Sequence, residues 1–117
     1  MPYPFASLEF NDFSSFPRES TGRPGISHYV LARTEDGVGL VHVAEFEPGT
    51  DTSSEGPQCH DFWEYVLILE GSMIDLTLNQ TFEKGMVAIR NPGMLHGPWK
   101  VPAGGCRLFE IRSRNPL

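Results

Sequence analysis

The chain has 117 residues, enough for one domain with a single core and too few for a catalytic domain plus a separate binding domain. Its formal net charge of −6 disfavours a nucleic-acid partner, because phosphate binding needs a basic surface. No apolar run approaches the roughly 20 residues that span a bilayer, and Pro2 and Tyr3 do not begin a secretory leader. We therefore expect a cytoplasmic protein without a membrane partner.

Glycine and proline are frequent, with 12 and 10 copies, and they divide the chain into short segments. Such a composition favours strands joined by tight turns over long helices. The two cysteines, Cys59 and Cys106, do not form a CxxC motif, and we interpret them as reduced thiols. The predicted fold class is all-β, an antiparallel sandwich or barrel with little helix.

Residues 1–25 are predicted to form an irregular N-terminal arm, and residues 26–117 the barrel domain. Four prolines and four phenylalanines share the arm: Pro2, Pro4, Pro17, Pro24, Phe5, Phe10, Phe13 and Phe16. Full burial of a phenylalanine is worth ~1.5–3 kcal/mol. We therefore expect the arm to pack on the barrel or on a partner subunit.

Strand patterns follow one another from Ile26 to the end of the chain. The expected strands are residues 28–33, 39–46, 58–71, 72–78, 86–90 and 106–112. Asn79-Gln80 predicts a two-residue hairpin turn, since asparagine tolerates a positive φ.

The stretch of residues 58–71, QCHDFWEYVLILEG, carries candidate ligands on one face. Strand alternation points Gln58, His60 and Glu64 the same way, and Gly71 is expected to end the strand. A second imidazole, His96, follows a proline-glycine turn. Two strand ends that each deliver an imidazole predict a metal pocket.

These two stretches resemble the two motifs of the cupin superfamily, which have the forms G…HxH(x)3–4E(x)6G and G(x)5PxG(x)2H(x)3N. The matching positions are His60, Glu64 and Gly71 in the first motif and Gly85, Gly93 and His96 in the second. Together the motifs cover residues 58–96, about a third of the chain. The resemblance implies an antiparallel double-stranded β-helix, the jelly-roll or cupin barrel, with a divalent metal and commonly a homodimer.

Three positions depart from the cupin pattern: Gln58 replaces the first histidine, Asn91 the first proline and Lys100 the final asparagine. A glutamine carbonyl is a weaker ligand than imidazole. The strong metal ligands would therefore be His60, Glu64 and His96. Gln58 would be either a fourth ligand or a residue that contacts the ligands without binding the metal. Fe2+ and Zn2+ suit this set best, and Mn2+ or Ni2+ would also accept it.

Four other side chains are candidates for the substrate pocket: Phe62, Arg90, His42 and Trp99. Each has a plainer alternative, namely core packing for Phe62, a surface salt bridge for Arg90, a structural role for His42 and an interface for Trp99. Glu64 is the candidate catalytic residue, because a carboxylate on an apolar inward face needs a cation and can act as a base.

Three functions remain open at this point. The resemblance implies a metal-dependent dioxygenase or isomerase acting on a small organic acid, enol or carbonyl compound. The phrase IRNPGMLHGPW is also similar to the zinc-binding cupins of certain anti-sigma factors, which favours a non-catalytic sensor that binds a metal or ligand. A structural barrel without a metal is the third possibility.

Overall fold

The computed structural model describes residues 8–117. Its eight strands are β1 (Arg18–Ser20), β2 (Ile26–Arg33), β3 (Leu40–Phe46), β4 (Trp63–Asp75), β5 (Gln80–Glu83), β6 (Val87–Arg90), β7 (Trp99–Lys100) and β8 (Cys106–Ser113). Two 3-10 turns, η1 (Phe13–Ser15) and η2 (Ser53–Glu55), are the helical segments of this part of the chain. The all-β prediction is confirmed.

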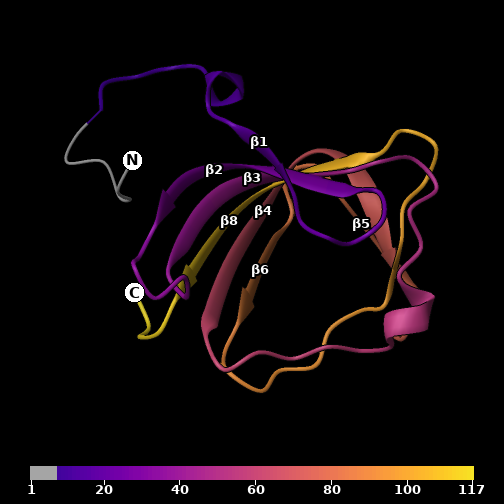
Figure 1. The fold of residues 1–117 in the computed structure, drawn as a ribbon. Coiled ribbons are helices and arrows are strands. Elements are labelled where there is room, and N and C mark those ends of the chain that lie inside the picture. Colours follow the sequence, from indigo (N-terminus) through magenta and orange to yellow (C-terminus); the bar gives the residue numbers. More distant parts are fainter. Residues whose placement is uncertain (1–7) are drawn as a thin grey trace.

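The strands form two facing layers that share β4. Strands β1, β2, β3, β8, β4 and β6 lie side by side in this order, all antiparallel, as one curved sheet (Figure 1). The end of β4 pairs with β5 and β7 in the second layer. This arrangement is the predicted double-stranded β-helix.

Strand β4 crosses from one layer to the other at Gly71, so the prediction that this glycine ends the strand is wrong. A register shift between Ile68 and Glu70 bends the strand, and Gly71 has a φ of 76°. A Cβ atom at this position would lie 2.0 Å from the carbonyl oxygen of Gly105. Glycine therefore permits both the bend and the close backbone contact.

Two other boundaries differ from the predictions. Strand β4 begins at Trp63 rather than at residue 58, so residues 58–62 are a loop. The β4–β5 turn comprises residues 76–79 rather than the pair Asn79-Gln80. The Asp75 carboxylate accepts the backbone N–H groups of Thr77 and Leu78, which stabilises the longer turn, and Asn79 has the expected positive φ of 54°.

The N-terminal arm is more regular than predicted, because residues 18–20 form β1 beside β2. Phe13 packs edge-on against Tyr29, with ring centroids 5.3 Å apart, and the Arg107 guanidinium lies over its ring. Phe10 is fully exposed, whereas Phe5 lies outside the described residues. The boundary between arm and barrel stays a prediction.

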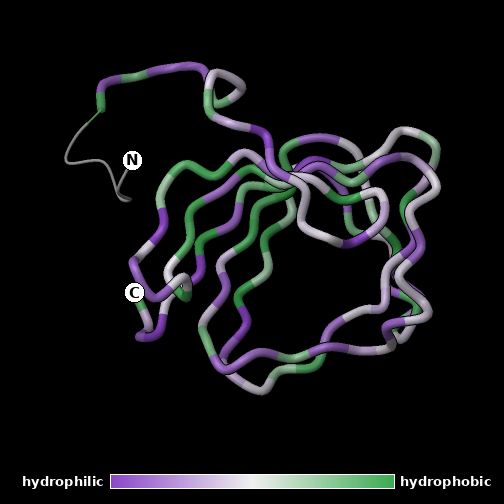
Figure 2. The backbone as a smooth tube through the Cα atoms, viewed as in Figure 1, coloured by the Kyte–Doolittle hydropathy of each residue, from purple (hydrophilic) through white to green (hydrophobic). Residues whose placement is uncertain are grey.

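The core lies between the two layers. Figure 2 shows that the strands of the large sheet carry much of the hydrophobic sequence. The buried cluster comprises Ile26, Ala44, Phe46, Val66, Ile68, Met73, Trp99, Val101, Cys106 and Leu108. Within residues 8–117 no helix is long and apolar enough to cross a membrane. A cytoplasmic location stays a prediction.

Candidate metal centre and its cavity

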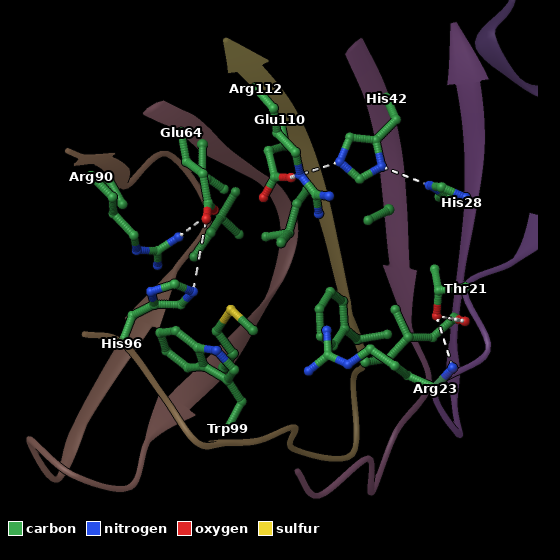
Figure 3. Close-up of a pocket in the computed structure, with 18 of the residues that line it drawn as sticks. Thr21, Arg23, His28, His42, Glu64, Arg90, His96, Trp99, Glu110 and Arg112 are labelled. Atoms are coloured by element: carbon green, nitrogen blue, oxygen red, sulfur yellow. Dashed lines mark hydrogen bonds and ion pairs between the residues drawn. The ribbon is translucent and has the colours of Figure 1, made fainter. Parts of the chain in front are cut away.

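A cavity of about 530 Å³ opens between the layers. Most of its wall is apolar and comes from the core, including Ile26, Phe46, Val66, Ile68, Met73 and Leu108. Polar side chains line the remainder, and they come from β1, β2, β3, β4, β6 and β8 and from the loops before β2, β4 and β7 (Figure 3). A small molecule inside would therefore meet both polar groups and an apolar surface.

His60, Glu64 and His96 come together in this cavity as predicted. Glu64 is the second residue of β4, while His60 and His96 lie on the loops before β4 and before β7. Glu64 Oε1 is 3.3 Å from His60 Nε2 and 3.9 Å from His96 Nε2. One ligand atom from each residue lies within 4.8 Å of the others, so the three could hold one metal ion.

Local hydrogen bonds orient His96 toward this centre. Its backbone forms two reciprocal hydrogen bonds with the backbone of Gln58, and each N···O distance is 2.9 Å. Its ring Nδ1 lies 3.2 Å from the Met94 carbonyl oxygen, to which it donates as Nδ1–H. The Nε2 lone pair is then directed at Glu64, a tautomer that histidines use when they bind metal through Nε2.

Burial sets the protonation of the three side chains. It lowers the pKa of His60, with help from Arg112, and that of His96, with help from Arg90. Burial and the nearby Glu110 carboxylate raise the pKa of Glu64 to about 7. The histidines are therefore neutral and ready to bind a metal, and a cation would stabilise the Glu64 carboxylate that burial disfavours. This donor set fits a divalent metal.

Arg90 and Trp99 also line the cavity, beside Glu64. Arg90 Nη1 is 3.3 Å from Glu64 Oε2, and its guanidinium carbon lies 5.7 Å from the Trp99 ring centroid. The Arg90 side chain is only 13% exposed, so this ion pair is not a surface salt bridge. The Trp99 backbone donates to Thr52 Oγ1, which holds the indole in the second layer.

Gln58 and Phe62 lie beside the histidines in different ways. Gln58 lines the cavity, and its side-chain amide donates to Glu55 Oε1 at 2.8 Å. Phe62 is not among the residues that line the cavity; its ring stacks on His60 with a centroid distance of 4.7 Å. Metal ligation by Gln58 and substrate contact by Phe62 stay predictions.

His42 lines the cavity and belongs to a second polar cluster with His28, Glu110 and Arg112. These three partners were not predicted from the sequence. Glu110 and Arg112 share strand parity with the buried Leu108, and His28 with Ile26. This parity could have indicated that the three side chains point inward. Their contact with His42, however, depends on the pairing of β2 with β3 and of β3 with β8.

No family model and no curated protein matches the chain. Among solved structures, an RmlC-like cupin from Shewanella frigidimarina is similar with a TM-score of 0.69 at 17% identity, covering 93% of each chain. The chain has the cupin fold.

Two further cupin-like matches cover most of this chain. An acetylacetone dioxygenase from Acinetobacter johnsonii has a TM-score of 0.68 at 10% identity, over 97% of this chain and 77% of that one. The Rhodobacter sphaeroides complex of SigE with the anti-sigma ChrR matches with a TM-score of 0.64 at 18% identity. This match covers 86% of this chain and 51% of that one. In this chain, the two motifs meet at the candidate metal centre.

Proposed function

We propose that this cupin binds one divalent metal through His60, Glu64 and His96 and acts as a dioxygenase or isomerase on a small organic acid or carbonyl compound. The convergence of the three side chains in a cavity carries the proposal. Two histidines and one carboxylate leave coordination positions open for substrate oxygens. The bound metal would supply Lewis-acid polarisation and, as Fe2+, oxygen activation.

The protein's own residues bind and orient the substrate in this proposal. The Arg90 guanidinium, beside Glu64, would hold an anionic oxygen, and Trp99 would close one side. The apolar part of the cavity wall, which includes Phe46 and Leu108, would accept the hydrocarbon portion of the substrate and exclude water. Glu64, whose pKa is raised to about 7, is also suited to proton transfer near neutral pH.

A substrate screen with controlled metal loading tests the reaction. Metal-free protein is loaded with Fe2+ or Zn2+ and incubated with 1,3-diketones and 2-oxo acids. A dioxygenase consumes O2 only with Fe2+, whereas an isomerase rearranges a compound without O2, as followed by NMR. The activity must disappear in His96→Ala; equal turnover in that variant would contradict the proposal.

A non-catalytic metal or ligand sensor is the second candidate. The weakened first motif, with Gln58 in place of a histidine, and the match to the SigE–ChrR complex favour it. A sensor would bind Zn2+ tightly and leave both O2 and every screened compound unchanged. The same screen therefore separates the two functions.

We further propose a homodimer formed through the outer face of the large sheet. Register places Tyr65 opposite Ile89 and Leu67 opposite Val87, so these side chains share that face. Val87 and Ile89 are 65% and 61% exposed. Such an apolar surface on an edge strand is typical of a protein interface, and the arm of residues 1–25 would pack on the barrel or on the partner.

A further inference from the structure

The polar cluster on β2, β3 and β8 forms a hydrogen-bonded row. His42 Nε2 is 2.8 Å from Glu110 Oε1, and His42 Nδ1 is 2.9 Å from His28 Nδ1. Figure 3 shows Glu110, His42 and His28 in sequence, with Glu64, Arg90 and His96 on the other side of Glu110. All of these residues line the same cavity, so one ligand could meet both groups.

The charge of Glu110 determines which nitrogens carry protons. The Arg112 guanidinium donates Nε–H to Glu110 Oε1 at 2.5 Å, so Glu110 pairs with a cation as a carboxylate. The same oxygen lies 2.8 Å from His42 Nε2 and accepts the hydrogen bond from Nε2–H. With one proton on the His42 ring, its Nδ1 carries a lone pair that accepts Nδ1–H from His28. This assignment leaves the lone pair of neutral His28 on Nε2.

His28 Nε2 has no hydrogen-bond partner within residues 8–117, and no buried side-chain nitrogen or oxygen of these residues is unsatisfied. The nitrogen is therefore accessible to solvent. The groups that act on His28 are Glu19 of β1, Arg33 of β2, His42 of β3 and Arg112 of β8. Burial and then His42 lower its pKa, and they outweigh Glu19, so His28 is in its basic form at neutral pH.

We propose that Glu110, His42 and His28 form a proton relay in which His28 Nε2 is a general base toward a carbonyl compound in the cavity. This inference rests on the proposed function, because the metal centre would hold and polarise that carbonyl. His28 is the catalytic residue, and His42 and Glu110 are positioning residues. The order carboxylate, imidazole, reacting group is that of hydrolase triads, with a second imidazole as the reacting group.

The relay accounts for each proton in the step. A C–H bond next to the carbonyl breaks, its proton goes to His28 Nε2, and its electron pair forms the enolate double bond with the charge on oxygen. His28 passes its Nδ1 proton to His42 Nδ1, which places the positive charge beside the Glu110 carboxylate. Reversal of these transfers returns a proton to the same or a neighbouring carbon.

The relay itself is tested in metal-free protein by 15N NMR with labelled histidine. We expect Nδ1–H on His28, Nε2–H on His42 and a protonation midpoint of His28 below 6.5. In His42→Phe, His28 should lose its preference for Nδ1–H, a change that a purely structural histidine would not produce. An Nε2–H tautomer or a protonated His28 at pH 7 in the wild type would overturn the relay.

Its catalytic role is tested by deuterium exchange at C3 of pyruvate, 2-oxobutyrate and phenylpyruvate in D2O. Metal-loaded wild type should exchange at least one of them faster than metal in buffer. His28→Gln should lower that rate ~10²-fold or more while retaining its metal. No exchange by loaded wild type, or equal exchange by the variant, overturns the role. Absence of metal binding refutes the proposed function instead, and the NMR experiment still decides the relay.

Discussion

At the scale of single residues, Glu64 makes stability depend on pH. Its pKa is about 7 in the folded protein, against an ordinary value of 4.5 for a glutamate. A raised pKa means that the folded state binds the proton more tightly, so the stabilisation is complete below pH 4.5 and is lost as pH rises to 7. Between pH 4.5 and 7, the free energy of unfolding of metal-free wild type should fall by about 3 kcal/mol relative to that of Glu64→Gln.

Urea unfolding of the two proteins between pH 4.5 and 8 measures this difference. Comparison with Glu64→Gln removes the contributions that other groups make to both profiles. Glu70→Gln is the matched control, because Glu70 is an exposed carboxylate on the same strand that pairs with Lys84. Its profile should parallel that of the wild type. If Glu64→Gln also parallels the wild type, the electrostatic description of Glu64 is wrong.

The same carboxylate makes metal affinity depend on pH. Below pH 7 the metal must displace the Glu64 proton, while His60 and His96, whose pKa values are lowered, are already neutral. Affinity should therefore fall by about tenfold for each pH unit below 7. Calorimetry with Zn2+ between pH 5.5 and 8, in buffers of different ionisation enthalpy, would count the released proton. A constant affinity over this range would contradict the ligand assignment.

The sequence predicted the metal group better than the relay for a physical reason. His60, Glu64 and His96 lie within two local motifs whose spacing can be read directly. His28 and Glu110 are 82 positions apart, from 28 to 110, and they meet through His42 because β3 lies between β2 and β8. Such a contact requires the strand order, which no single segment specifies.

At the scale of elements, Gly71 determines how β4 serves both layers. Gly71→Ala would place a Cβ 2.0 Å from the Gly105 carbonyl oxygen, in addition to the strain of a positive φ. We expect the free energy of unfolding to fall by roughly 3 kcal/mol or more, or the variant not to fold, because the backbone at both Gly71 and Gly105 must move. Thermal and urea unfolding would measure it.

Gly85→Ala is the matched control for this substitution. Gly85 has a similar φ of 88°, but a Cβ there meets nothing within 4 Å. Its loss should be limited to conformational strain, about 1–2 kcal/mol. Equal losses for the two variants would show that the contact with Gly105 contributes nothing.

The strand predictions failed where side-chain alternation gives no boundary. His60 faces the cavity as alternation predicts, yet residues 58–62 are a loop, because only the isolated Gln58–His96 bridge pairs there. Gly71 resembles a strand end in sequence, whereas its positive φ serves a bend. Strands β2, β3, β6 and β8 were located within two residues, whereas β5 and β7 were not predicted.

At the scale of the whole molecule, the exposed apolar face predicts association. Light scattering coupled to size exclusion should give twice the 13.1 kDa mass of one chain. The double substitution Val87→Lys and Ile89→Lys should give a folded monomer, because it charges the centre of the proposed interface. Thr81→Lys, at an exposed position of β5, should remain dimeric. A monomeric wild type would refute this interface.

The metal content of protein purified without an affinity tag tests the central claim most directly. Wild type, His28→Gln and Glu70→Gln should each hold close to one divalent metal per chain, by elemental mass spectrometry. His60→Ala and His96→Ala should hold about a tenth of that or less, because each loses one of three strong ligands. Equal and negligible metal in all five proteins, also after incubation with Fe2+ or Zn2+, would contradict the metal centre.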